Sequence, residues 1–207
     1  MLTVAFNYGI NLRMKSTYFV FLLFIGLQGF AQKATQKIGV VYYNQVDPDL
    51  KKQLLSNIKA TYNCTVVEIL ASRALPAAAY YKPRNRYRAT GLLDDLSPIK
   101  GYDKVIGVTS KDISTTLGPR YDWGVMGLAR SPGKPCVIST FRIKTADKAK
   151  FNDRFIKVAL HELGHTMGIP HCKLSKTCFM QAAEGTVKTV DRETRNMCTN
   201  CKKILNR

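Results

Sequence analysis

The sequence predicts an α/β (α+β) fold, and three observations support that prediction. An apolar segment, an amphipathic helical segment and a second apolar segment follow one another between residues 38 and 70. This is the order of a βαβ unit with parallel strands. Further strand-like segments then precede a long amphipathic helical pattern at residues 148–167. Mostly irregular sequence follows that pattern, which predicts a small C-terminal subdomain.

The first predicted strand covers residues 38–43, where uninterrupted apolar residues are typical of a sheet buried on both faces. A helix is expected to begin at residues 47–49, with Leu50, Leu54, Leu55 and Ile58 on its buried face. Residues 64–70 form the second predicted strand. Residues 72–84 contain Pro76 and Pro83 and predict a loop.

A second helix is expected to follow this loop, through Leu92, Leu93 and Leu96. Three more strands are predicted, at residues 103–109, 123–128 and 135–141. The last two are expected to be joined by a turn at residues 130–134, where serine, proline and glycine follow one another. A final helix is predicted from about Val190.

Residues 14–31 have the build of a secretory signal peptide. Lys15 supplies the positive start, residues 18–27 the apolar core and residues 29–31 a small-residue cleavage region. We therefore expect residues 1–31 to be an N-terminal extension and signal peptide, with the start at Met14 and cleavage before Gln32. The apolar run is shorter than the roughly 20 residues of a spanning helix, so no stable membrane anchor is expected after cleavage. A buried N-terminal strand or helix is the alternative interpretation.

Export implies a periplasmic or extracellular location, and residues 32–207 are then a single domain. The formal charge of +18 falls to +16 on cleavage, because Arg13 and Lys15 are the charged residues removed. Such a basic chain attracts polyanions, and residues 82–88 combine basic with aromatic side chains. No nucleic-acid recognition motif accompanies them, so we expect a solvated basic surface and no specific nucleic-acid partner.

The chain has three histidines, and all of them lie within residues 161–171, HELGHTMGIPH. An α-helix advances 100° per residue, so His161 and His165 project from one face, one turn apart. Gly168 allows the chain to reverse, which can bring His171 back as a third ligand. Three protein ligands and an open fourth position are typical of a catalytic zinc. Glu162 lies beside this pair and can reach a water molecule on the metal as general base.

An inert helix with surface histidines is the alternative interpretation of this motif. The third histidine and the apolar face of the same helix argue against it, because the metal face and the core face are segregated. The apolar residues are Phe155, Ile156, Ala159, Leu160, Leu163 and Met167. The motif thus predicts a zinc hydrolase of the metallopeptidase type that acts on peptide or protein substrates, and residues 14–31 predict its secretion.

The residues after the motif extend this pattern. Two cysteines, a methionine and a CxxC pair follow His171: Cys172, Cys178, Met180, Cys198 and Cys201. Together with HExxHxxGxxH, they resemble the signature of the archaemetzincin family of zinc metallopeptidases, within the metzincin clan. The five residues between Cys172 and Cys178 are one more than the usual family spacing, a difference that a loop absorbs.

This resemblance implies a metzincin-like zincin fold: a twisted mixed five-stranded sheet with flanking helices, an active-site helix and a small C-terminal subdomain. Residues 32–168 would form the upper subdomain and residues 169–207 the lower one. Met180 would lie in the Met-turn beneath the metal, although an ordinary core methionine is also possible. Residues 124–129 would be an edge strand that binds extended substrate. Family members are described as aminopeptidase-like.

The resemblance also implies that Cys172, Cys178, Cys198 and Cys201 hold a second, structural zinc. Disulfides are the alternative, because export places thiols in an oxidising compartment. Cys64 and Cys136 could be bridged or be two buried free thiols, and we favour free thiols. A secreted zinc-binding protein without catalysis is the alternative function, but metal binding alone would not require Glu162. The oligomeric state is not indicated by the sequence.

Overall fold

The computed structural model describes residues 36–62, 64 and 66–206, which fall within one compact unit of residues 34–207. The predicted extension and signal peptide, residues 1–31, lie outside the described residues. Within the part of the chain that is described, no helix is both long and apolar enough to cross a membrane. The fold is mixed α/β, as the sequence predicts.

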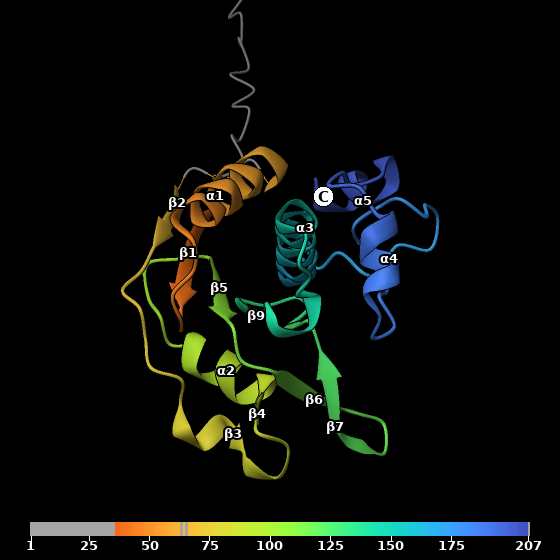
Figure 1. The fold of residues 1–207 in the computed structure, drawn as a ribbon. Helices are drawn as coiled ribbons and strands as arrows, with labels where there is room; N and C mark the ends of the chain where they lie inside the picture. Colours follow the sequence, from red (N-terminus) through yellow and green to blue (C-terminus); the bar gives the residue numbers. More distant parts are fainter. Residues whose placement is uncertain (1–35, 63, 65, 207) are drawn as a thin grey trace, which may run out of the picture. The chain divides into compact units, whose positions relative to one another are not determined.

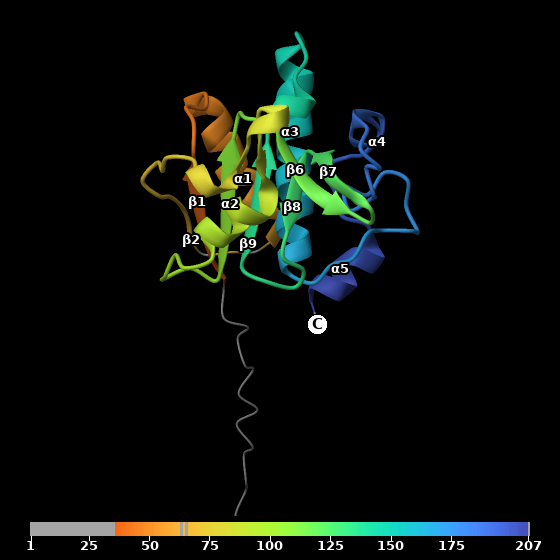
Figure 2. The ribbon, with the colours of Figure 1, turned by 90° about the horizontal axis from the view of Figure 1, so that it is seen from below.

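The main sheet has five strands in the order β2-β1-β5-β9-β8 (Figures 1 and 2). The strands are β1 (Lys37–Tyr42), β2 (Val66–Ile69), β5 (Lys104–Thr109), β8 (Gly127–Ala129) and β9 (Pro135–Ser139). Neighbouring strands from β2 to β9 pair in parallel, and β8 pairs with β9 in antiparallel. This is the predicted mixed five-stranded sheet, with β8 as its edge strand.

Helices cover both faces of this sheet (Figure 1). One core cluster joins Ile38 and Val40 of β1 to α1 (Pro48–Tyr62) and α3 (Lys148–Thr166). A second cluster joins Val41 to α2 (Ala89–Leu96) on the opposite face. Successive side chains of a strand point to opposite faces, so both faces of β1 are buried. This explains why residues 38–43 are apolar without alternation.

A second sheet of four short strands was not predicted. Its order is β3-β4-β6-β7, with β3 (Tyr80–Tyr81), β4 (Arg86–Arg88), β6 (Ile113–Leu117) and β7 (Arg120–Val125). Two 3₁₀ turns, Ala77–Ala79 and Lys82–Arg84, flank β3. The predicted loop at residues 72–84 thus contains a short strand and two turns.

The strand predicted at residues 123–128 is wrong as a single strand. Trp123, Gly124 and Val125 end β7 in the second sheet, whereas Gly127 and Leu128 belong to β8 in the main sheet. The chain changes sheets at Met126, whose carbonyl accepts a hydrogen bond from the Ser139 N–H at 2.8 Å. Figure 2 shows the β6–β7 hairpin leading into β8, which packs directly on α3.

The final helix predicted from Val190 is also wrong in extent, because two short helices occupy this region: α4 (Val187–Arg192) and α5 (Thr199–Leu205). Between them, the Thr194 N–H donates to the Thr177 carbonyl at 2.8 Å, and the Asn196 carbonyl accepts from the Phe179 N–H at 3.4 Å. These bonds tie the segment to the chain before it and prevent a continuous helix.

Candidate metal centre and cavity

The histidine helix α3 is capped at both ends. At its start, the Asp147 carboxylate accepts a hydrogen bond from the Lys150 N–H at 3.0 Å. At its end, the N–H groups of Gly168 and Ile169 donate to the carbonyls of His165 and Gly164, at 2.9 and 3.1 Å. This is a Schellman arrangement, and Gly168 has the positive φ of 82° that it requires. The chain therefore reverses where the sequence predicts.

The reversal brings the three histidines together. The potential ligand nitrogens of His161, His165 and His171 all lie within 4.8 Å of one another. The Nε2 atoms of His161 and His165 are 3.0 Å apart. Two nitrogens bound to one tetrahedral zinc at 2.0–2.1 Å would be about 3.3 Å apart. The cluster therefore has the dimensions of a three-histidine zinc site.

Hydrogen bonds set the tautomers of two of these rings. The Nδ1 of His161 lies 2.7 Å from the Phe179 carbonyl oxygen, and the Nδ1 of His165 lies 2.8 Å from that of Ile169. A carbonyl oxygen only accepts, so each Nδ1 carries the proton and each Nε2 presents a lone pair. Two lone pairs facing each other at 3.0 Å repel unless a cation lies between them. The donor set thus fits a metal ion.

Burial also favours the neutral, metal-binding form of the rings. It lowers the pKa of His161 to about 3, and the neighbouring His165 acts in the same direction. Burial lowers the pKa of His165 and of His171 as well. His171 is exposed, whereas His161 and His165 are partly covered. The open side of the cluster is therefore the side of His171.

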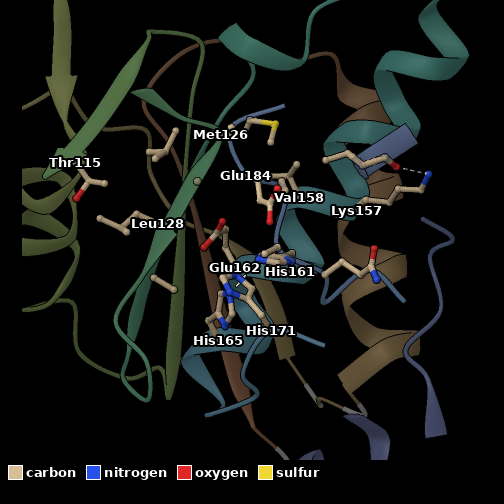
Figure 3. Close-up of a pocket in the computed structure, with 18 of the residues that line it drawn as sticks. Thr115, Met126, Leu128, Lys157, Val158, His161, Glu162, His165, His171 and Glu184 are labelled. Atoms are coloured by element: carbon tan, nitrogen blue, oxygen red, sulfur yellow. Dashed lines mark hydrogen bonds between the residues drawn. The ribbon is translucent and has the colours of Figure 1, made fainter. Parts of the chain in front are cut away.

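Glu162 is buried beside the cluster, on the wall of the same cavity. Figure 3 shows its side chain next to the three histidines. Burial raises the pKa of this carboxyl group to about 8. Gly127 of β8 leaves room for the Glu162 side chain, because a Cβ built on Gly127 would lie 2.4 Å from Glu162 Cγ. The edge strand thus approaches α3 as closely as a glycine allows.

The cavity has a volume of about 600 Å³. The residues that line it come from β6, β7 and β8, from α3, and from the chain between residues 170 and 193. Figure 3 shows Met126 and Leu128 on the strand side and Lys157 and Val158 on the helix side, with the histidines at one end. The predicted substrate strand, residues 124–129, therefore forms a wall of this cavity.

The four C-terminal cysteines form a second cluster. The sulfur atoms of Cys172, Cys178, Cys198 and Cys201 lie within 4.8 Å of one another, and all four are free thiols. The Cys172 and Cys198 sulfurs are 3.6 Å apart. Zinc–sulfur bonds of about 2.3 Å in a tetrahedron place sulfurs about 3.8 Å apart, whereas a disulfide requires about 2.05 Å. The arrangement fits a metal better than disulfides.

Met180 is fully buried and lies close to α3. A Cβ built on Gly164, next to His165, would lie 2.6 Å from the Met180 sulfur. The Met180 carbonyl accepts from the Cys172 N–H at 2.7 Å. The methionine therefore packs against the histidine helix, and its backbone is bonded to Cys172 of the cysteine cluster.

Cys64 and Cys136 are both buried free thiols, as we favoured. Cys136 lies in β9, but Cys64 precedes β2 and is not in a strand. Within the basic segment at residues 82–88, Arg86 pairs with Asp112 and Asp122 at 3.1 and 3.2 Å. That this segment binds no specific nucleic acid stays a prediction.

Several residues of the cavity were given no individual role from the sequence, among them Gly127 and Glu193. A glycine inside a strand pattern is a signal of close backbone approach, so Gly127 was detectable. Glu193 also lines the cavity and is buried. It lies in the segment that was predicted as a helix, and no motif includes it.

Comparisons with known proteins agree with this geometry. The family model described as Peptidase family M54 matches residues 37–207. Archaemetzincin from Halobacterium salinarum is 33% identical over 178 residues, which cover 82% of this chain and 99% of that protein. Archaemetzincin from Methanopyrus kandleri is 39% identical over 143 residues, which cover 68% of this chain and 78% of that protein.

Solved structures give the same result. The crystal structure of archaemetzincin from Methanopyrus kandleri superposes with a TM-score of 0.74 at 31% identity and covers 86% of this chain and 97% of that one. Archaemetzincin from Archaeoglobus fulgidus, complexed with malonate, gives a TM-score of 0.70 at 31% identity and covers 82% and 99%. The chain therefore belongs to peptidase family M54, the archaemetzincins, and is a zinc metallopeptidase.

Proposed function

We propose that this peptidase hydrolyses peptide bonds with a catalytic zinc held by His161, His165 and His171 and with Glu162 as the general base. The observation that carries the proposal is the pair of facing Nε2 lone pairs, 3.0 Å apart, beside a buried carboxyl group. When bound, zinc supplies Lewis acidity, which acidifies a water molecule and polarises the substrate carbonyl.

The protein side of this reaction is proton transfer and positioning. Glu162 has to be ionised to act as the base, and the positive charge of a bound zinc would lower its raised pKa. The carboxylate then takes a proton from the attacking water and passes it to the leaving amine. Phe179 and Ile169 hold the two buried imidazoles through their carbonyls. Edge strand β8 offers main-chain groups to an extended substrate along the cavity. The family resemblance favours aminopeptidase-like cleavage near a free N-terminus.

The same proposal assigns a structural zinc to Cys172, Cys178, Cys198 and Cys201. Four thiols within 4.8 Å leave no open position for substrate, which is typical of a structural site. The proposal also includes export, from the order of charge, apolar core and small residues in residues 14–31. A periplasmic or extracellular peptidase then acts on peptides or proteins that it meets there.

The test is Glu162→Gln in the purified mature protein. We expect peptide hydrolysis to fall about 10²- to 10⁴-fold, because general acid–base catalysis contributes that much. The zinc content should stay at the wild-type value. His161→Ala is the control, since it should lose both activity and one zinc ion. Wild-type hydrolysis by the Glu162→Gln protein would contradict the assignment of the base.

A further inference from the structure

Glu193 lies in the wall of the cavity, away from the histidines in sequence, and its carboxyl group has no assigned role. It follows α4, and its N–H donates to the Thr189 carbonyl at 3.1 Å. The side chain is buried, with 6% of its surface exposed. Its Oε1 is fully covered and has no hydrogen-bond partner among the described residues. A buried carboxylate without a partner is unfavourable, so such a group needs an explanation.

The basic side chains nearby do not provide that partner. Burial raises the pKa of Glu193 to about 7, and the positive charges of Lys157 and Arg192 act in the opposite direction. Lys157 Nζ lies 2.5 Å from the Asp153 carboxylate and donates to the Val190 carbonyl at 3.0 Å. Arg192 donates to the Thr189 hydroxyl. Both cations therefore have other partners, and Glu193, which lines the cavity, makes no hydrogen bond through Oε1 among the described residues.

The neighbouring walls are apolar. Val190 and Val158 line the cavity from the C-terminal segment and from α3, and Trp123, Val125 and Met126 line it from the strands. A lysine or arginine side chain has the matching composition, because its stem is aliphatic and its end carries a positive charge and hydrogen-bond donors. An ionised carboxylate only accepts hydrogen bonds, so a charged donor satisfies it best.

We propose that Glu193 is a specificity-determining residue, which binds the ammonium or guanidinium group of a lysine or arginine side chain of the peptide substrate within this cavity. The inference rests on the proposed peptidase function and names a substrate class for it. The apolar walls hold the stem of that side chain, and Glu193 holds its charged end.

The experiment compares peptides that differ by one amine. Each peptide is made with an acetylated and with a free N-terminus, because the proposed function favours cleavage near a free N-terminus. It carries lysine or norleucine at one position, which is scanned on both sides of the cleaved bond. Norleucine keeps the aliphatic stem and lacks the charge. We expect wild-type kcat/KM to favour lysine about 10- to 100-fold at one position, the range typical of a hydrogen bond to a charged group.

Glu193→Gln should bring this ratio close to one, whereas kcat/KM for the norleucine peptide should change less than about twofold. Glutamine keeps the size and a neutral hydrogen bond, so the charge is what is tested. Glu184→Gln is the matched control, because this exposed carboxylate lines the same cavity. Solvent screens its charge, and the ratio should fall less than about threefold.

A wild-type ratio near one at every position overturns the inference without any variant, provided that the peptides are cleaved. Equal effects of Glu193→Gln and Glu184→Gln would also overturn it, since the buried carboxylate would then have no special role. Peptides with a free N-terminus form a second arm. If Glu193→Gln changes only the ratio of free to acetylated peptides, the side-chain assignment is wrong and the N-terminal ammonium is the ligand. If the wild-type protein cleaves no peptide, the proposed function itself fails.

Discussion

Gly127→Ala tests whether edge strand β8 sets the position of the proposed base. An alanine Cβ would lie 2.4 Å from Cγ of Glu162 and 2.6 Å from its Oε1. Carbon atoms in contact are normally about 3.5–4.0 Å apart, so either β8 or the Glu162 side chain must move by about 1 Å. The backbone of Gly127 does not have a positive φ, so the effect is steric.

A displacement of about 1 Å at a catalytic group lowers the rate by about 100-fold, which is about 2.7 kcal/mol of transition-state stabilisation. Overpacking also lowers the free energy of unfolding, by about 1–3 kcal/mol. The histidines are not in the clash, so zinc should be retained. We therefore expect kcat/KM about 100-fold below wild type, with unchanged zinc content and a folded protein in thermal denaturation.

Ala129→Gly is the control for this substitution. Ala129 lies two residues further along β8, so its methyl group points to the same face and packs on the core cluster that includes α3. Removing it should lower the unfolding free energy by about 0.5–1 kcal/mol and leave kcat/KM within about threefold. If Gly127→Ala keeps wild-type kcat/KM, then β8 does not position Glu162 and the steric reasoning is refuted.

The other predictions concern metal content, acid stability and export. Cys201→Ser should reduce the zinc content in elemental analysis from two ions per chain to one and lower the thermal midpoint; a wild-type protein with one zinc and no free thiols would instead indicate disulfides. The Arg154 guanidinium lowers the pKa of Asp191 from 3.8 to about 2, so this pair stabilises the fold fully above about pH 4 and its contribution is lost as the pH falls through about 2. The thermal midpoint of Asp191→Asn should therefore fall less between pH 4 and pH 2 than the midpoint of the wild-type protein. An equal fall in both proteins would contradict this prediction. Expression of the chain from Met14 should yield an exported protein whose first residue is Gln32 in N-terminal sequencing, and an uncleaved chain in the cytoplasm would contradict the signal peptide.

The sequence predicted the parts of the fold that have a clear period or a demanding motif. The main-sheet strands predicted at residues 38–43 and 103–109 contain uninterrupted apolar runs, at residues 38–43 and 105–108, and both exist as β1 and β5. The reversal after the histidine helix was predictable because one residue, Gly168, has to take a positive φ there. The helical period of 3.6 residues per turn predicted that His161 and His165 lie side by side. In the structure their Nε2 atoms are 3.0 Å apart.

Other parts could not be predicted, because their cause is tertiary. Strands β3 and β4 have two and three residues, too few for an alternating pattern to be visible. Residues 123–128 form one apolar run, and only the pairing partners show that the chain changes sheets at Met126. Glu193 has no sequence neighbours that mark it, since its burial comes from the packing of α4 against α3.

The carbonyl of Phe179 that orients His161 lies between Cys178 and Met180, in the segment that binds to residues 194–196 near the C-terminus. Two of the four clustered thiols, Cys198 and Cys201, belong to the last ten residues of the chain. During synthesis, the histidine centre therefore lacks this support until residues 194–201 have been made. A nascent or truncated chain would have the HExxH helix without a correctly oriented first imidazole. The histidine helix can thus form early in synthesis, whereas the support of its first imidazole depends on contacts with residues made about 30 positions later.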